Sequence, residues 1–291
     1  MTPTIGSAFT ATVRGGELHG YRYGPDDDGV PAILAIHGVT ASSRSWLAVA
    51  AQLAGVRILA PDLRGRGRSR DLPPPYGLRQ HAEDLASLID TYGMDHPLVL
   101  GHSMGGFCAV ALADIADLGG VMLIDGGFPL QVPAGMDQAT LVPAVLGPAL
   151  ERLGMTFESE DAYLAFWRDH PALAPDWSPE IEDYLRYDLF GTAPELRAST
   201  RVESVMVDTD DEFGSGWYLD AMSRMRMPVT ALRAPRGLLD GDPLYTSGRM
   251  EEFQAQIPQL HVVDVADVNH YTITMSERGA RAVAGTAHTL L

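Results

Sequence analysis

A serine stands midway between two glycines in the stretch Gly101-His102-Ser103-Met104-Gly105. The residues before it, 98–100, are Leu-Val-Leu and predict a short apolar strand, whereas the residues after it predict a helix. A Gly-x-Ser-x-Gly pattern at such a junction predicts a nucleophile elbow, a turn so sharp that the serine hydroxyl is exposed. A side chain at Gly101 or Gly105 would strike the neighbouring strand or helix. Ser103 is therefore the candidate nucleophile.

A serine nucleophile sets further requirements. Its hydroxyl reacts poorly at neutral pH unless a base removes the proton during attack, and histidine has an ordinary pKa suited to that task. The attack creates an oxyanion, which needs preorganised hydrogen-bond donors. Among the nine histidines, His102 beside the serine is expected to be structural, and His37 is expected to support the loop that follows it.

Strands alternate with helices on both sides of this turn. Buried or half-buried strands are expected at residues 9–13, 17–23, 31–36, 56–60, 98–100, 120–125, 228–232 and 261–265, and helices at 45–53, 78–92, after Ser103, at 245–257 and at 276–291. This alternation indicates a parallel sheet with right-handed crossovers. The chain is therefore expected to be of the α/β class.

The alternation breaks between residues 126 and 227. No buried strand is convincing there, and helices are expected at 139–153, 159–169, 179–189 and 217–226. The segment also holds Trp167, Trp177 and Trp217. It is expected to be a helical insertion into the sheet domain.

Four motifs in this order resemble the α/β-hydrolase fold family: His37-Gly38 after the third strand, the turn Asp62-Leu63-Arg64-Gly65-Arg66-Gly67-Arg68-Ser69 after the fourth, the Ser103 elbow after the fifth, and His270 after the eighth. The resemblance implies a mostly parallel eight-stranded sheet flanked by helices. It assigns residues 1–125 and 228–291 to the core and residues 126–227 to an inserted helical cap. The arginines of the second motif could suggest a phosphate site, but the resemblance makes that segment a structural turn.

The resemblance also implies roles for single residues. His270 takes the place of the base that faces the elbow, and the backbone N–H groups of Val39 and Met104 take the place of the oxyanion hole. The nucleophile is serine rather than aspartate, which argues against an epoxide hydrolase or a dehalogenase. No cofactor is implied.

The acid that completes the triad departs from the common pattern. Most members of the family carry it a few residues after strand seven, where this chain has Arg236-Gly237, and Asp240 and Asp242 lie slightly beyond. Some branches place it at the end of strand six, where Asp125 stands. A strand end is a rigid position, so Asp125 is preferred, Asp242 is the alternative and Asp240 is third.

Composition limits the partners. The 291 residues carry a formal net charge of −17, which disfavours nucleic acid and anionic membrane surfaces. A single cysteine, Cys108, excludes an intrachain disulfide and a cysteine-based zinc site, and no His, Asp and Glu cluster has metal-ligand spacing. No apolar run reaches membrane-spanning length and no signal peptide is evident, so a cytoplasmic monomer or homodimer is expected.

The resulting hypothesis is a serine hydrolase that cleaves a carboxylic ester or lactone of a largely apolar small molecule through an acyl-enzyme. Trp167, Tyr184 and Trp217 are the candidates for the substrate pocket. The alternatives are a cofactor-free haloperoxidase, a carbon–carbon bond hydrolase, and a ligand receptor with slow turnover, because the fold serves all of these.

Overall fold

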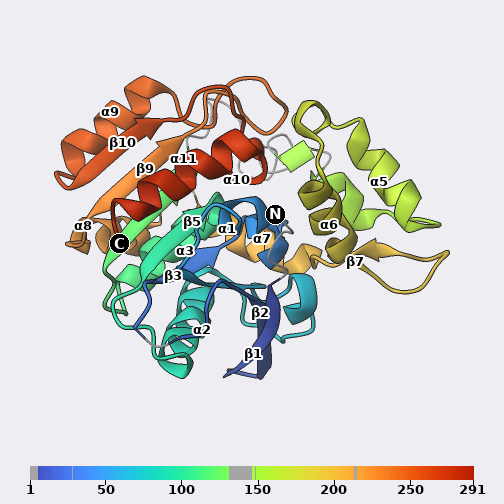
Figure 1. The fold of residues 1–291 in the computed structure, drawn as a ribbon, viewed down its shortest axis with the longest axis horizontal. Coiled ribbons are helices and arrows are strands. Elements are labelled where there is room, and N and C mark those ends of the chain that lie inside the picture. The colour runs from blue at the N-terminus through green and yellow to red at the C-terminus, as the bar shows by residue number, and fades with distance from the viewer. Residues whose placement is uncertain (1–5, 28, 131–145, 148, 213–214) are drawn as a thin grey trace.

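The structure is a computed structural model that describes residues 6–27, 29–130, 146–147, 149–212 and 215–291 (Figure 1). Most of the helix expected at 139–153 therefore lies outside the described residues. Within the described part of the chain, no helix combines the length and the apolar character needed to cross a bilayer.

One eight-stranded sheet has the strand order β1-β2-β4-β3-β5-β6-β9-β10. The strands are β1 (Ser7–Val13), β2 (Gly16–Tyr23), β3 (Ala32–Ile36), β4 (Arg57–Pro61), β5 (Leu98–His102), β6 (Gly120–Ile124), β9 (Val229–Arg233) and β10 (Leu260–Asp264). Strand β2 runs antiparallel to both β1 and β4, and all the other pairings are parallel. The predicted fold class, a mostly parallel eight-stranded sheet, is thereby confirmed.

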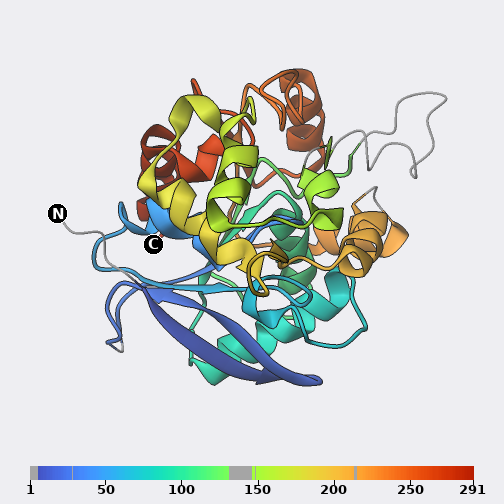
Figure 2. The same ribbon diagram turned by 90° about the vertical axis from the view of Figure 1, so that its right-hand side faces the viewer.

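Helices cover both faces of this sheet (Figures 1 and 2). They are α1 (Leu47–Ala50), α2 (Leu78–Thr91), α3 (Met104–Ala113), α8 (Gly216–Arg224), α9 (Ser247–Gln256), α10 (Thr272–Met275) and α11 (Glu277–His288). Alternate strand residues face opposite ways, so Leu34 and Ile36 of β3 join the core under α2 and α3, whereas Ile33 and Ala35 join the core under α11. The strands are buried on both faces, which explains their continuous apolar sequences.

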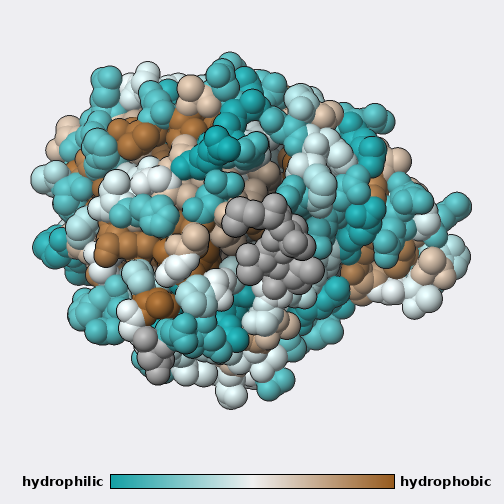
Figure 3. All heavy atoms as spheres, viewed as in Figure 1, coloured by the Kyte–Doolittle hydropathy of each residue, from teal (hydrophilic) through white to brown (hydrophobic). Residues whose placement is uncertain are grey.

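A smaller lobe, called the cap from here on, lies at one end of the sheet, at the right in Figure 1. It contains α5 (Glu160–Arg168), α6 (Pro179–Asp188) and the short strands β7 (Leu189–Phe190) and β8 (Arg197–Ala198), which pair antiparallel. Ser159 and Ser178 cap α5 and α6 by accepting backbone N–H bonds, a strong helix-start signal in the sequence. The lobe buries an apolar core formed mainly by residues 149–196, to which Met275 of α10 also contributes, and Figure 3 shows mainly hydrophilic residues on its outer surface.

Only part of the segment 126–227, which was expected to form the cap, belongs to this lobe. Helix α8 packs against α3, and its buried residues belong to the core of the sheet domain rather than to that of the lobe. Helix α7 (Val202–Asp211) is not predicted from the sequence. Its Val202 and Met206 are exposed while Ser204 and Asp208 are buried, so no apolar stripe marks it.

Candidate active site

Ser103 occupies the sharp turn between β5 and α3. Its φ of 55° and ψ of −125° place it in a strained region that costs on the order of 1–3 kcal/mol for a residue with a side chain. A Cβ at Gly101 would lie 2.3 Å from the Gly105 carbonyl oxygen, and one at Gly105 would lie 2.1 Å from that of Ile36. Such short distances would be steric clashes, which explains why the turn requires glycine at both positions.

His270 and Asp125 form a buried pair beside this turn. The His270 Nδ1 lies 2.7 Å from the Asp125 Oδ2, and both residues are buried. The other carboxylate oxygen of Asp125 accepts the Ala234 N–H at 3.1 Å, which ties the end of β6 to the end of β9. Asp125 is held in a left-handed conformation, with φ at 44°. The structure thus brings the first-choice acid against the predicted base.

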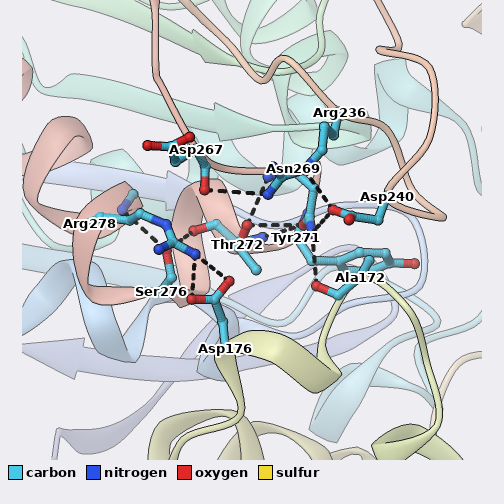
Figure 4. A network of polar contacts seen from close by, with 11 residues as sticks. Ala172, Asp176, Arg236, Asp240, Asp267, Asn269, Tyr271, Thr272, Ser276 and Arg278 are labelled. Carbon is cyan, nitrogen blue, oxygen red and sulfur yellow. Dashed lines mark hydrogen bonds and ion pairs between the residues drawn. The ribbon is translucent and has the colours of Figure 1, made fainter.

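The two alternative acids lie elsewhere. The Asp240 Oδ1 accepts a hydrogen bond from Asn269 Nδ2 at 2.9 Å and pairs with Arg236 at 2.8 Å (Figure 4). Asp242 lies on a separate cavity of about 340 Å³ beside Pro129 and Leu130. Asp240 therefore contacts the neighbour of His270 rather than its ring, and Asp242 lines a different cavity.

Asn269 organises the loop that carries His270, a role that the sequence analysis missed. Its side-chain oxygen accepts the N–H groups of Tyr271 and Thr272 at 3.1 and 2.9 Å, while its Nδ2 donates to the Ala172 carbonyl of the cap at 2.9 Å (Figure 4). An Asn followed by backbone donors two and three residues later is a turn signal that could have identified it.

The cap contacts the sheet domain at two further places. Arg278 of α11 pairs with Asp176 at 2.5 Å, close to the Asn269 network in Figure 4. On the other side of the cap, the buried Arg152 pairs with Asp188 at 3.1 Å and donates to the Thr40 carbonyl at 2.7 Å. The cap is therefore fixed both to the histidine loop and to the loop after β3.

The predicted oxyanion residues flank the serine. Val39 lies on the same small cavity as Ser103 and His270. Met104 is the first residue of α3, so its N–H has no partner within the helix and lies at the positive end of the helix dipole. A Cβ on Gly38 would lie 3.1 Å from the Ser103 Cβ, so the absence of a side chain at Gly38 lets the two segments approach each other.

Two other buried histidines support the site in the neutral form. Burial lowers the pKa of His37 to about 3, and its Nε2 accepts the Leu63 N–H at 2.9 Å, so Nδ1 carries the proton and donates to the Gly38 carbonyl at 2.8 Å. Burial and the neighbouring His270 lower the pKa of His102 to about 3. The His102 Nε2 lies 2.7 Å from the His270 carbonyl oxygen. Both histidines therefore hold loops, in agreement with the structural roles expected for them.

The cavity at Ser103 is small, about 30 Å³. Its apolar walls come from Leu146, Tyr184, Leu238, Tyr271 and Met275. Of the three aromatic residues predicted for the pocket, only Tyr184 lies on this cavity. Trp167 is buried in the core of the cap against Tyr163 and Phe166, and Trp217 packs beside Tyr218 and beneath Arg79.

The fold and this arrangement define the class of protein. The sequence profile of the Alpha/beta hydrolase family matches residues 33–286, and the chain belongs to that family.

The chain is 36% identical over 141 residues to Lipase LipV of Mycobacterium tuberculosis, covering 47% of this chain and 53% of LipV. It is 28% identical over 229 residues to Epoxide hydrolase B of the same organism, covering 76% of this chain and 60% of that protein. The chain thus spans between half and two thirds of the length of these two relatives. A solved structure of E-2-(acetamidomethylene)succinate hydrolase is similar in fold, with a TM-score of 0.79, 22% identity and coverage of 97% and 99% of the two chains.

Proposed function

We propose that this protein is a serine hydrolase that cleaves a carboxylic ester or lactone of a small, largely apolar molecule through an acyl-enzyme. The observation that carries the proposal is the arrangement of three residues. Ser103 is half-buried on a strained turn and shares a cavity with His270, and His270 is hydrogen-bonded at 2.7 Å to the buried Asp125. A nucleophile, a base and a carboxylate that orients the base are the parts that acyl transfer requires.

In this mechanism His270 removes the proton of Ser103 as the hydroxyl attacks the ester carbonyl. Asp125 holds the imidazole in the productive tautomer and stabilises the imidazolium that forms. The N–H groups of Val39 and Met104 stabilise the oxyanion. His270 then gives its proton to the leaving alcohol, and a water activated by the same histidine hydrolyses the acyl-enzyme.

The walls of the cavity support an apolar substrate, because they are formed by aliphatic, aromatic and thioether side chains. The cavity of about 340 Å³ shares Leu238 with the smaller one, so the larger part of the substrate has room beside the 237–246 loop. The relationship to LipV favours ester cleavage, and a serine at position 103 favours it over epoxide opening.

Hydrolysis of nitrophenyl esters tests the proposal. Wild-type protein should turn over acetyl to octanoyl esters, and Ser103→Ala should fold normally and lose about a million-fold in kcat, as expected when a serine triad loses its nucleophile. Ser45→Ala is a matched control, since Ser45 is a buried serine that donates only to the Ser42 carbonyl. Equal activity of wild type and Ser103→Ala, or binding of esters without turnover, would contradict the proposal.

A further inference from the structure

The side chain of Arg66 contacts both residues assigned to the oxyanion hole. Its Nε donates to the Val39 carbonyl oxygen at 2.9 Å, and its Nη2 lies 3.8 Å from the Met104 Sδ. Arg66 is fully buried and comes from the turn after β4, just before the short helix η2 (Gly67–Ser69). One guanidinium group thus links the two backbone segments that must stay at a fixed distance from each other.

The contact with Val39 acts on the orientation of its N–H. That N–H belongs to the same peptide unit as the Gly38 carbonyl, which accepts hydrogen bonds from His37 Nδ1 at 2.8 Å and from the Ala41 N–H at 3.1 Å. Arg66 holds the carbonyl of the next peptide unit. Because the units on both sides of the Val39 Cα are held, the direction of the N–H is fixed before substrate arrives.

A buried guanidinium needs a compensating charge, and Asp208 of α7 supplies it. The Asp208 Oδ2 lies 2.5 Å from Arg66 Nη1, and its carboxylate also accepts the Gly77 N–H at 2.7 Å and lies 3.0 Å from His81 Nε2. Burial alone would raise the pKa of Asp208, but the charges of Arg66 and His81 and the hydrogen bonds lower it to about 2. The pair therefore stays ionised at neutral pH, and removing either partner would leave a buried charge uncompensated.

Arg64 provides an internal comparison. It is equally buried and comes from the same turn, and it pairs with Asp84 at 2.8 Å. Its remaining donors bind the carbonyls of Pro73 and Arg14 at 2.6 and 2.8 Å. These partners join the turn to its surroundings and do not belong to the loop of Val39 or to α3. Arg64 therefore has the burial and charge of Arg66 without its contacts to the site.

We propose that Arg66, with Asp208 as its counter-ion, is a positioning residue of the oxyanion hole, which holds the Val39 carbonyl and the Met104 side chain so that the two N–H donors converge on the oxyanion. The inference rests on the proposed function, because it assumes that an oxyanion forms between these groups. Arg66 does not touch the substrate. It acts through the backbone, and a segment from outside the sheet, α7, contributes to the geometry through Asp208.

Paired variants Arg66→Met and Arg64→Met test the inference. Both remove one buried guanidinium from the same turn, so both are expected to lower stability. Removal of one oxyanion donor costs about 100- to 1000-fold in kcat, and misplacement of a donor should cost somewhat less. Arg66→Met should therefore lose about 10- to 100-fold in kcat, with KM changed less than about three-fold. Arg64→Met, measured on its folded fraction, should keep kcat within about three-fold of wild type.

Affinity for phenylboronic acid supplies a second readout that a purely structural role would not move. The boronate forms a tetrahedral adduct on a serine, with an oxygen in the oxyanion position, so its affinity should fall in Arg66→Met by about the same factor as kcat/KM. It should be unchanged in Arg64→Met. If Arg66→Met does not fold, Arg66→Lys keeps the charge but loses the fork of donors, and about a ten-fold loss of kcat with unchanged KM is expected.

The outcomes separate the two proposals. Equal kcat and boronate affinity in the Arg66 and Arg64 variants, with an active wild type and an inactive Ser103→Ala, would overturn the role of Arg66 and leave the proposed function intact. Inactivity of the wild type toward esters would overturn the proposed function itself. A selective loss in the Arg66 variants would establish the positioning role.

Discussion

Ser103, Asp125 and His270 are far apart in the sequence and meet only because three parallel strands end at the same edge of the sheet. Asp125 follows β6 and Ser103 follows β5, and these two strands are direct neighbours. His270 reaches them from the loop after β10. The carboxyl ends of parallel strands are therefore the place where residues from distant motifs can converge.

The catalytic role of Asp125 is a prediction at this scale. Asp125→Asn should preserve the fold and lower kcat by about ten-thousand-fold, because an amide favours the wrong tautomer of His270. The measurement is kcat for a nitrophenyl ester, with folding checked by circular dichroism.

The controls are Asp242→Asn and Asp240→Asn. Asp242→Asn should cost much less in kcat than Asp125→Asn, because Asp242 lines the larger cavity assigned to the substrate and not the cavity shared by Ser103 and His270, so any effect falls mainly on KM. Asp240→Asn should cost only a few-fold, through Asn269, because this residue does not contact the His270 ring. A larger loss at Asp242 than at Asp125 would return the acid to the loop after strand seven.

The sequence could indicate which residue types the site needs. It indicated less well which of several residues of the same type lies at the site. Motif order was sufficient to single out Ser103 and His270. The choice among three aspartates depended on loop paths, and the preference for Asp125 agrees with its contact to His270. The aromatic residues were harder to assign, because Trp167 and Tyr184 both belong to the cap core and only packing places Tyr184 on the cavity as well.

At the scale of elements, the strands and the long helices follow the predicted ranges closely. Continuous apolar runs mark the strands, since both faces are buried, and amphipathic spacing marks α2 and α11. Helix α7 is an element that these patterns do not predict. Its buried side is mostly polar, with Asp208 paired to Arg66 across the interface, and a local sequence pattern contains no information about a partner more than a hundred residues away.

The close approach of α3 to β3 gives a prediction for this scale. Gly105→Ala should destabilise the protein by about 3 kcal/mol, because the new Cβ would lie 2.1 Å from the Ile36 carbonyl oxygen and backbone must move to admit it. Gly285→Ala in α11 is the matched control, since a Cβ there meets nothing within 4 Å, and it should gain up to about 1 kcal/mol. Urea unfolding measures both, and equal midpoints for the two variants would contradict the packing argument.

At the scale of the whole molecule, the cap and the sheet domain are joined by buried arginines. The chain has no lysine, so all 21 basic side chains are arginine. Arg66 and Arg152 are fully buried, and each pairs with a carboxylate and donates to a carbonyl of the loop after β3. The planar guanidinium suits this task, because it can bind a carboxylate and a carbonyl at the same time. The loop at the site is therefore held from both the sheet domain and the inserted segment.

The most direct test of the central claim is covalent labelling with an alkyl fluorophosphonate, followed by mass spectrometry. Because trypsin can cut only at arginine in this chain, Ser103 is released in the peptide 80–152, and fragmentation locates the adduct. We predict one phosphonate per chain, on Ser103, with no labelling of Ser103→Ala and labelling slowed at least about a thousand-fold in His270→Ala. An adduct on another residue, or ester hydrolysis by a wild-type protein that the reagent does not label, would contradict the account.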